Sequence, residues 1–169
     1  MKPLKFDGIK GNWATLILPI NCDESIDYSL LAQEIDLLID ANVDGIYSNG
    51  SAGEFYNVTE GEFDMVSEIL ASKCNKASIN FQIGVSHMSP IISIERLRRT
   101  VDLKASAIQV ILPDWFAPTN EESIIFLKKM EEMAQGIGLV LYNPPHAKKK
   151  LTIQDISVLK ESVPGLIGV

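Results

Sequence analysis

The chain lacks several features that would assign it to a specialised class of protein. Its two cysteines, Cys22 and Cys74, are far apart and form no CxxC pair. We therefore expect neither a disulfide framework nor a zinc site. The separate cysteines also indicate a reducing compartment, and we expect the cytoplasm. No apolar run reaches the ~20 residues that a membrane-spanning helix needs. The apolar segment 13–20 fits a buried strand better than a signal peptide, because it carries a late proline and no small-residue cleavage site.

Positive charge is also scarce. The chain has 15 Lys and Arg against 22 Asp and Glu, a net charge of −7. Nucleic acid is therefore an unexpected partner, since phosphate binding needs clustered basic residues. The one basic run, 148–150, is predicted to be a solvated turn. With 169 residues, 46% of them hydrophobic, and no linker, residues 1–169 are expected to form one domain with a real core.

Six short apolar runs divide the chain. Each is continuous rather than alternating, which is typical of strands buried on both faces of a parallel sheet. The predicted strands are 14–20, 44–49, 80–85, 107–113, 138–143 and 165–169.

Helical patterns lie between these runs. The predicted helices include 29–41, 59–70, 89–101 and 119–127. Two of them begin with a capping box, Thr59 with Glu62 and Thr119 with Glu122. Ser89 is the expected N-cap of a third, directly before a proline. The repeating unit is one strand and one helix of roughly thirty residues, as in parallel α/β proteins.

Two architectures fit this order, an open doubly wound sheet and a closed (β/α)₈ barrel. The first strand-to-helix turn has no GxGxxG fingerprint, which weakens the dinucleotide-binding form of the open sheet. A (β/α)₈ barrel typically needs ~250 residues. This chain has room for five βα units and the start of a sixth strand, so a barrel would be incomplete.

Candidate functional residues lie where the strands end, because both architectures place their sites there. The small residues 50–53 allow close approach of a ligand to backbone N–H groups, although this motif taken alone is better explained by a tight turn that needs glycine for its backbone angles. Tyr142 is either an acid–base group or an aromatic packed in the interior. His87 and His146 form no metal-ligand spacing, and each is better explained as a loop residue than as a catalytic base.

The motifs "GIYSNGSAGEFYNVT", "LVLYNPP" and "LIGV", in this order, resemble the dihydrodipicolinate synthase/N-acetylneuraminate lyase family. These are (β/α)₈ enzymes that act on 2-oxo acids through a lysine Schiff base. The resemblance implies that the N–H groups of Ser51 and Ala52 hold the substrate carboxylate and that Ser51 and Tyr142 relay protons. It implies no cofactor, and a dimer or tetramer of the chain.

The family's nucleophilic lysine would be the residue directly after Val169. A partial gene product, a truncated form or a modified lysine would each explain its absence. We expect the isolated chain to be unstable or aggregated, because an open barrel exposes a strand edge.

Two substitutions depart from the synthases of this family. Trp115 stands where they carry a relay tyrosine, and Ala147 where they carry an arginine for the second substrate's carboxylate. We therefore expect an aldolase or dehydratase for pyruvate or a 2-keto-3-deoxy sugar acid. A true dihydrodipicolinate synthase and a non-catalytic 2-oxo-acid binder stay open, while a phosphate-binding barrel is disfavoured. The expected substrate-binding residues are Gly50, Ser51, Ala52, Trp115, Asn143 and His146.

Overall fold

The structure is a computed structural model that describes residues 1–169, and its centre is a single parallel sheet. Its six strands lie side by side in the order in which they occur along the chain. They are β1 (Trp13–Thr15), β2 (Gly45–Ser48), β3 (Asn80–Gly84), β4 (Ala107–Val110), β5 (Gly138–Leu141) and β6 (Leu166–Gly168). All six predicted strands are confirmed, but each observed strand is shorter than its apolar run, because backbone pairing stops before the run does.

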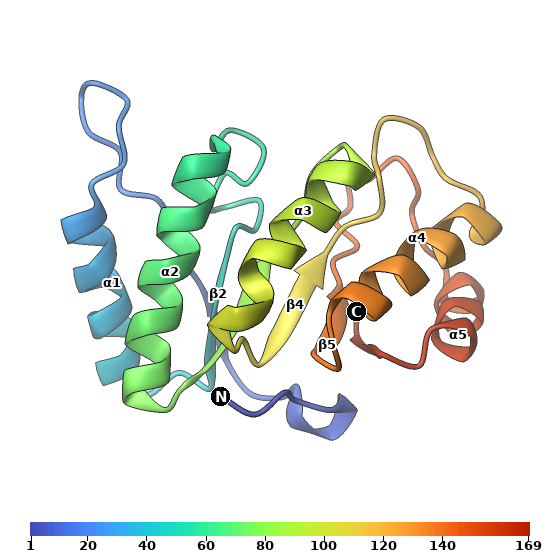
Figure 1. The fold of residues 1–169 in the computed structure, drawn as a ribbon, viewed down its shortest axis with the longest axis horizontal. Helices are drawn as coiled ribbons and strands as arrows, with labels where there is room; N and C mark the ends of the chain where they lie inside the picture. Colours follow the sequence, from blue (N-terminus) through green and yellow to red (C-terminus); the bar gives the residue numbers. More distant parts are fainter.

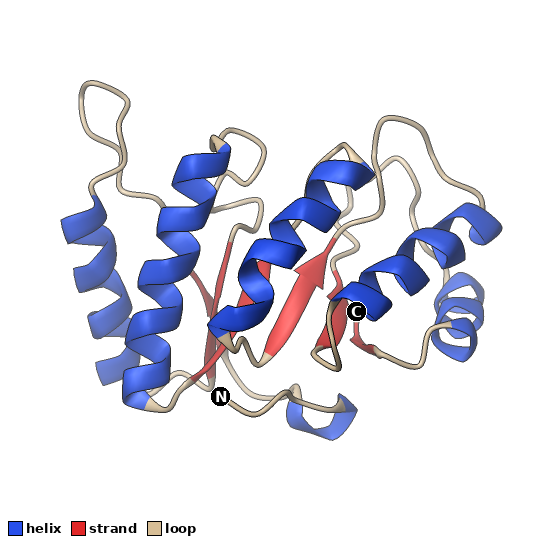
Figure 2. Cartoon of the chain, viewed as in Figure 1, coloured by secondary structure: helices blue, strands red, loops and turns tan.

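Five helices cover one face of this sheet, and consecutive helices pack against each other (Figures 1 and 2). They are α1 (Tyr28–Asp40), α2 (Glu60–Ala77), α3 (Pro90–Thr100), α4 (Asn120–Met133) and α5 (Ile153–Ser162), and two short 3₁₀ helices span Phe6–Gly8 and Val101–Leu103. A doubly wound sheet reverses its strand order and carries helices on both faces. The sequential order and one-sided helices therefore define part of a (β/α)₈ barrel, as predicted.

The main core lies between the helices and the sheet. Thirty buried apolar residues form one continuous cluster there. On β4, Ile108 and Val110 belong to this cluster, and on β3, Phe81 and Ile83 do. Because side chains alternate along a strand, the residues between them face the barrel interior. One set of strand side chains therefore packs in the core and stabilises the fold, and the other set lines the barrel interior, the lumen.

The predicted helix starts are confirmed, with one correction. Both capping boxes form, Thr59 with Glu62 and Thr119 with Glu122. Ser89 does occupy the N-cap position of α3, but its side chain makes no capping hydrogen bond. Its N–H instead donates to His87 Nδ1 at 2.9 Å, which ties the turn before the helix together.

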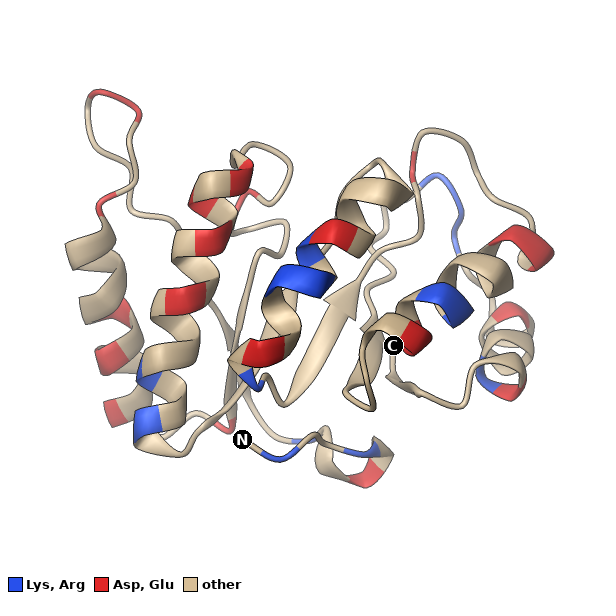
Figure 3. Ribbon diagram, in the orientation of Figure 1, with Lys and Arg blue, Asp and Glu red and all other residues tan.

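The surface carries acidic residues on all five helices, without a continuous basic face in the view of Figure 3. No helix of the structure has both the length and the apolar composition that crossing a membrane requires. The two cysteines differ in environment, since Cys22 is exposed and Cys74 is buried. Burial raises the pKa of the Cys74 thiol to about 12, which keeps it protonated and unreactive.

Candidate active site

The loops after β2 and β5 meet at the carboxyl edge of the sheet. Ser51 Oγ donates a hydrogen bond to the hydroxyl of Tyr142 at 3.4 Å, although the two residues are 91 positions apart. The backbone of Tyr142 is held by the sheet, because its N–H donates to Val110 O at 2.8 Å. The phenol therefore extends from a fixed strand end toward the loop that carries Ser51. The two predicted catalytic residues are in contact.

The loop after β2 leaves backbone donors unused beside this contact. Within the loop, the N–H of Gly53 donates to Gly50 O and the N–H of Glu54 donates to Ser51 O. No protein acceptor takes the N–H of Ser51 or of Ala52. Two adjacent free N–H groups next to two hydroxyls are suited to binding a carboxylate.

The glycines of this loop are required for space rather than for their backbone angles. A Cβ on Gly50 would lie 2.8 Å from the Tyr47 ring, and a Cβ on Gly53 would lie 2.8 Å from the backbone oxygen of Leu16. Neither glycine has a positive φ, whereas the flanking Asn49 and Glu54 do, at 55° and 49°. The loop does form a tight turn, but the prediction that the turn needs these glycines for their backbone angles is wrong, because close packing explains them.

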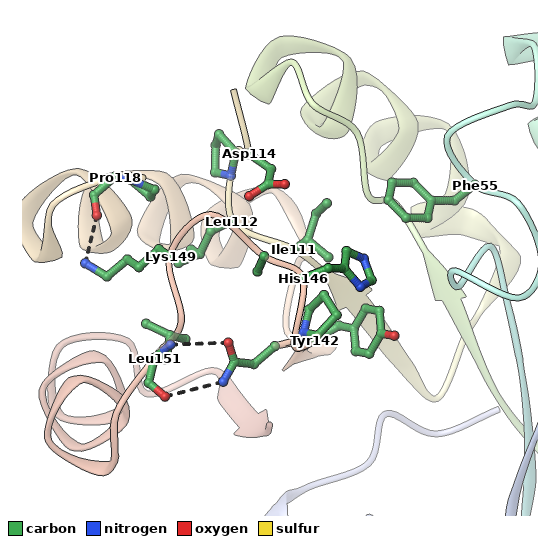
Figure 4. A pocket seen from close by; sticks show the side chains of 13 residues that line it. Phe55, Ile111, Leu112, Asp114, Pro118, Tyr142, His146, Lys149 and Leu151 are labelled. Carbon is green, nitrogen blue, oxygen red and sulfur yellow. Dashed lines mark hydrogen bonds between the residues drawn. The ribbon is translucent and has the colours of Figure 1, made fainter. Parts of the chain in front are cut away.

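A small cavity of about 50 Å³ opens next to Tyr142 (Figure 4). The residues around it come from the loops after β2, β4 and β5: Phe55, Ile111, Leu112, Pro113, Asp114, Pro118, Tyr142, Asn143, Pro144, His146, Ala147, Lys149 and Leu151. Three predicted site residues, Tyr142, Asn143 and His146, are thus brought to one cavity. Its walls are mixed, with apolar side chains beside a carboxylate, an imidazole and an ammonium group.

Asn143 is already engaged within the protein. Its Oδ1 accepts a hydrogen bond from the N–H of Leu151 at 3.3 Å, and its Nδ2 donates to the carbonyl of Leu151 at 3.5 Å (Figure 4). These bonds close the loop after β5 on itself. His146 is exposed at the other side of this loop. The structure therefore gives Asn143 a bracing role, and its contact with substrate stays a prediction.

The loops after β4 and β5 are fastened to each other by two side chains. The N–H of Lys148 donates to Asp114 Oδ1 at 2.7 Å. Lys149 Nζ donates to Pro118 O at 2.8 Å and to Asn120 Oδ1 at 2.6 Å. The prediction that 148–150 is a solvated turn is wrong for Lys149, which is partly buried by these contacts. In a run of three lysines, nothing in the sequence distinguishes the middle one, so these hydrogen bonds of Lys149 could not be predicted.

Trp115 lies apart from this cavity. It is 69% exposed, and its ring meets Phe116 edge to face at a centroid distance of 6.2 Å. Together they line a wider apolar groove of about 490 Å³ between the start of α3 and α4. Other exposed apolar residues of this groove are Met88, Ile91 and Ile125. The predicted contact of Trp115 with substrate stays a prediction, because the structure places its side chain outside the Tyr142 cavity.

A buried arginine, which the sequence analysis did not single out, connects the Ser51 loop to the next strand end. Arg96 of α3 is fully buried, and its guanidinium donates to Ser86 O at 2.7 Å and to Phe55 O at 3.4 Å. The same group pairs with Glu60 at 2.8 Å and lies 4.7 Å from the centre of the Phe63 ring. Arg96 therefore holds the loop after β2 and the loop after β3 in one arrangement.

This network shifts the pKa values of its neighbours. Burial acts to raise the pKa of Glu60, but hydrogen bonds from Arg96 and Arg99 outweigh it, and the pKa lies below its ordinary value. Burial, joined by the positive charge of Arg96, lowers the pKa of His87. The Nδ1 of His87 accepts the hydrogen bond from the N–H of Ser89 in the turn before α3, as an unprotonated ring nitrogen can. No group of three or more His, Cys, Asp or Glu side chains is placed to hold a metal ion.

These features define a (β/α)-barrel site in which a phenol and a hydroxyl face unused backbone donors. The model of the dihydrodipicolinate synthetase family matches residues 8–169, and the chain belongs to this family.

Two curated relatives and one solved structure illustrate the similarity. The chain is 27% identical to the trans-O-hydroxybenzylidenepyruvate hydratase-aldolase of Sphingobium xenophagum, over 88% of this chain and 46% of that protein. It is 27% identical to the N-acetylneuraminate lyase of Gallus gallus, over 95% of this chain and 54% of that protein. A putative dihydrodipicolinate synthetase from Pseudomonas aeruginosa superposes with a TM-score of 0.87 at 23% identity, over 94% of this chain and 54% of that one. The chain spans about half the length of the curated relatives it matches.

Proposed function

We propose that the protein is a Schiff-base lyase, an aldolase or dehydratase, that acts on a 2-oxo acid such as pyruvate or a 2-keto-3-deoxy sugar acid. The observation that carries this proposal is the contact of Ser51 Oγ with the Tyr142 hydroxyl beside the free N–H groups of Ser51 and Ala52. A carboxylate bound by these N–H groups would present its neighbouring 2-oxo carbon to the two hydroxyls. The nucleophilic lysine is expected directly after Val169.

The chemistry assigns a separate task to each group. The lysine amine adds to the 2-oxo carbon, and loss of water leaves an iminium that withdraws electrons. In an aldolase, the bond between the third and fourth carbons breaks, its electron pair enters the iminium to form an enamine, and the fourth carbon leaves as an aldehyde. Proton transfer at the enamine and hydrolysis then release pyruvate and the amine. Tyr142 would transfer protons in these steps, with Ser51 as its hydrogen-bonded partner.

The choice of lyase over synthase rests on the cavity, because the relatives include a hydratase-aldolase and a lyase as well as synthases. The cavity presents Ala147 where, by resemblance, synthases carry an arginine for the second carboxylate. Alanine provides no bidentate donor for a carboxylate. An aldehyde without a second carboxylate, such as a sugar or an aromatic aldehyde, is therefore favoured.

We also propose a cytoplasmic homo-oligomer, a dimer or tetramer. The exposed, unpaired thiol of Cys22 is compatible with a reducing compartment. The groove with Trp115 and Phe116 gathers exposed apolar side chains, and such patches commonly mark subunit contacts. A second copy of the chain is the occupant that we propose for this groove. Sedimentation of wild type and Trp115→Glu at equal concentration checks it, because a monomer in both would remove the proposal.

A substrate panel tests the proposed activity on the full-length protein that the gene encodes. We expect release of pyruvate from a 2-keto-3-deoxy sugar acid or from a benzylidenepyruvate. We expect no condensation of pyruvate with a carboxylate-bearing aldehyde at comparable rate. Condensation without cleavage would support a synthase, and saturable pyruvate binding without turnover would support a non-catalytic binder.

A further inference from the structure

Two glutamines interrupt the inner face of the sheet. Gln109 lies between Ile108 and Val110 on β4, and Gln82 lies between Phe81 and Ile83 on β3. The four apolar neighbours belong to the helix-side core, so both glutamines face the barrel lumen. The interior of this fold is usually filled by bulky apolar side chains such as Val, Ile and Leu. Two amides at these positions therefore need an explanation.

Both amides are buried and incompletely hydrogen bonded. Gln109 is 7% exposed, and its Nε2 has no hydrogen-bond partner. Gln82 is 5% exposed, and its Oε1 has none. A buried polar group without a partner destabilises the folded state, and such groups are rare in proteins. An unused donor in a lumen below a site is a feature that a bound ligand would satisfy.

Only one of the two amides lies next to the site. Gln109 is in register with Val140, two residues before Tyr142, so its backbone is one row, about 6.6 Å, below that of Tyr142 along the strands. Its Nε2 lies 3.8 Å from the position that a Cβ on Gly50 would occupy. The amide thus lies against the first residue of the loop whose next two N–H groups are free. Gln82 pairs with Ala107, one row further from the site.

We propose that Gln109 is a substrate-binding residue whose Nε2 donates a hydrogen bond to the carboxylate of the bound 2-oxo acid. The N–H groups of Ser51 and Ala52 and the amide of Gln109 then surround the carboxylate from two sides. This inference rests on the proposed function. Within residues 1–169 the amide has no partner, and the bound acid would satisfy it, which accounts for a polar residue at a lumen position.

The test compares Gln109→Met with Gln82→Met in the full-length protein, with pyruvate as the ligand. Methionine keeps the length of glutamine and removes its hydrogen-bonding groups. For Q109M we expect a melting temperature equal to wild type or higher by about 2–4 °C. We expect its affinity for pyruvate, measured by calorimetry, to fall roughly tenfold, as for one lost hydrogen bond to a charged group. Q82M should show the same thermal behaviour with unchanged affinity.

A second variant, Gln109→Glu, places a negative charge at the same position. Because like charges repel, it should weaken pyruvate binding more than Q109M does. The inference is overturned if wild type binds pyruvate and Q109M binds it within twofold, or if Q109M melts well below Q82M. Pyruvate binding to wild type is measured before any variant is compared. If wild type shows no saturable binding, the proposed function itself fails.

Discussion

The two faces of the sheet differ in the buried polar groups that the same strands contribute to them. On the helix side, β4 contributes Ile108 and Val110 to a continuous apolar cluster of 30 buried residues. On the lumen side, the same strand contributes Gln109, whose amide nitrogen lacks a partner, and Thr15 Oγ1 on β1 also lacks one. One face therefore stabilises the fold, while the other carries buried polar groups without a partner in residues 1–169, which we propose that a ligand satisfies. Substitutions on the two faces should therefore affect different properties.

The largest effect is expected at the lumen rim, on activity alone. Tyr142→Phe removes the hydroxyl that accepts the hydrogen bond from Ser51. Loss of a proton-transfer group should lower kcat by ~10²–10⁴-fold. The free energy of unfolding should stay within about 0.5 kcal/mol of wild type, because the ring remains in place. Steady-state kinetics measures the change in kcat, and urea unfolding measures the change in the free energy of unfolding. Wild-type kcat in Y142F would make this phenol a packing group.

On the helix side, Phe63→Ala should reduce stability. Phe63 is fully buried and supports the guanidinium of Arg96 at 4.7 Å. Truncating a buried phenylalanine costs about 3–5 kcal/mol. Leu37→Ala, at a position on α1 that is 69% exposed, is the control and should change stability by about 0.5 kcal/mol or less. Equal effects of the two substitutions in chemical denaturation would contradict the assignment of the core.

Arg96 should affect both properties, because it joins the core to the Ser51 loop. Arg96→Met leaves the carbonyls of Phe55 and Ser86 without their donor and Glu60 without one cation. The expected loss of stability is about 2 kcal/mol, since Glu60 stays partly solvated. Because the loop is released, KM for the 2-oxo acid should rise more than kcat falls. Arg98→Met, on an exposed part of the same helix, is the control. An unchanged KM in R96M would limit Arg96 to a structural role.

The smallest effect concerns the start of α5 and depends on pH. Hydrogen bonds from the Thr152 backbone, Asn120 and the Thr152 side chain lower the pKa of Asp155 to about 2. Its pKa in the unfolded chain is ~3.9. Because the folded value is lower, ionised Asp155 stabilises the fold above about pH 4, and this contribution is lost as the pH falls toward about 2. Unfolding of wild type and Asp155→Asn should therefore converge between these pH values. A difference that is constant from pH 6 to pH 2 would contradict this.

The helix side of the sheet could be predicted from the sequence, because continuous apolar runs and capping boxes are local signals. The two capping boxes, Thr59 with Glu62 and Thr119 with Glu122, could be predicted from residue type and spacing alone, and both form. The strands end earlier than their runs, since residues such as Ile111 stay buried after pairing stops. The periodicity of the sequence left both an open sheet and a barrel possible. The motif resemblance favoured the barrel, and the strand order confirms it.

The site was predictable in part. The contact between Ser51 and Tyr142 fits the relay that the family resemblance of the motifs after β2 and β5 implied, and neither residue alone implied it. Arg96 and Lys149 gave no signal, because a lone arginine or lysine in a polar pattern is usually solvated. Gln109 could not be recognised from the sequence, because a single polar residue within the apolar run 107–113 has no evident role. Its meaning depends on the row of the barrel in which it lies and on the glycine above it.

The most direct test of the central claim is reductive trapping. The full-length protein is incubated with pyruvate and borohydride, its intact mass is measured, and the modified peptide is mapped. The Schiff-base account predicts one pyruvate-derived adduct per chain, on a lysine directly after Val169, and slower trapping in Tyr142→Phe. A folded, full-length protein that forms no adduct, or that forms one only on a surface lysine such as those of 148–150, would contradict it.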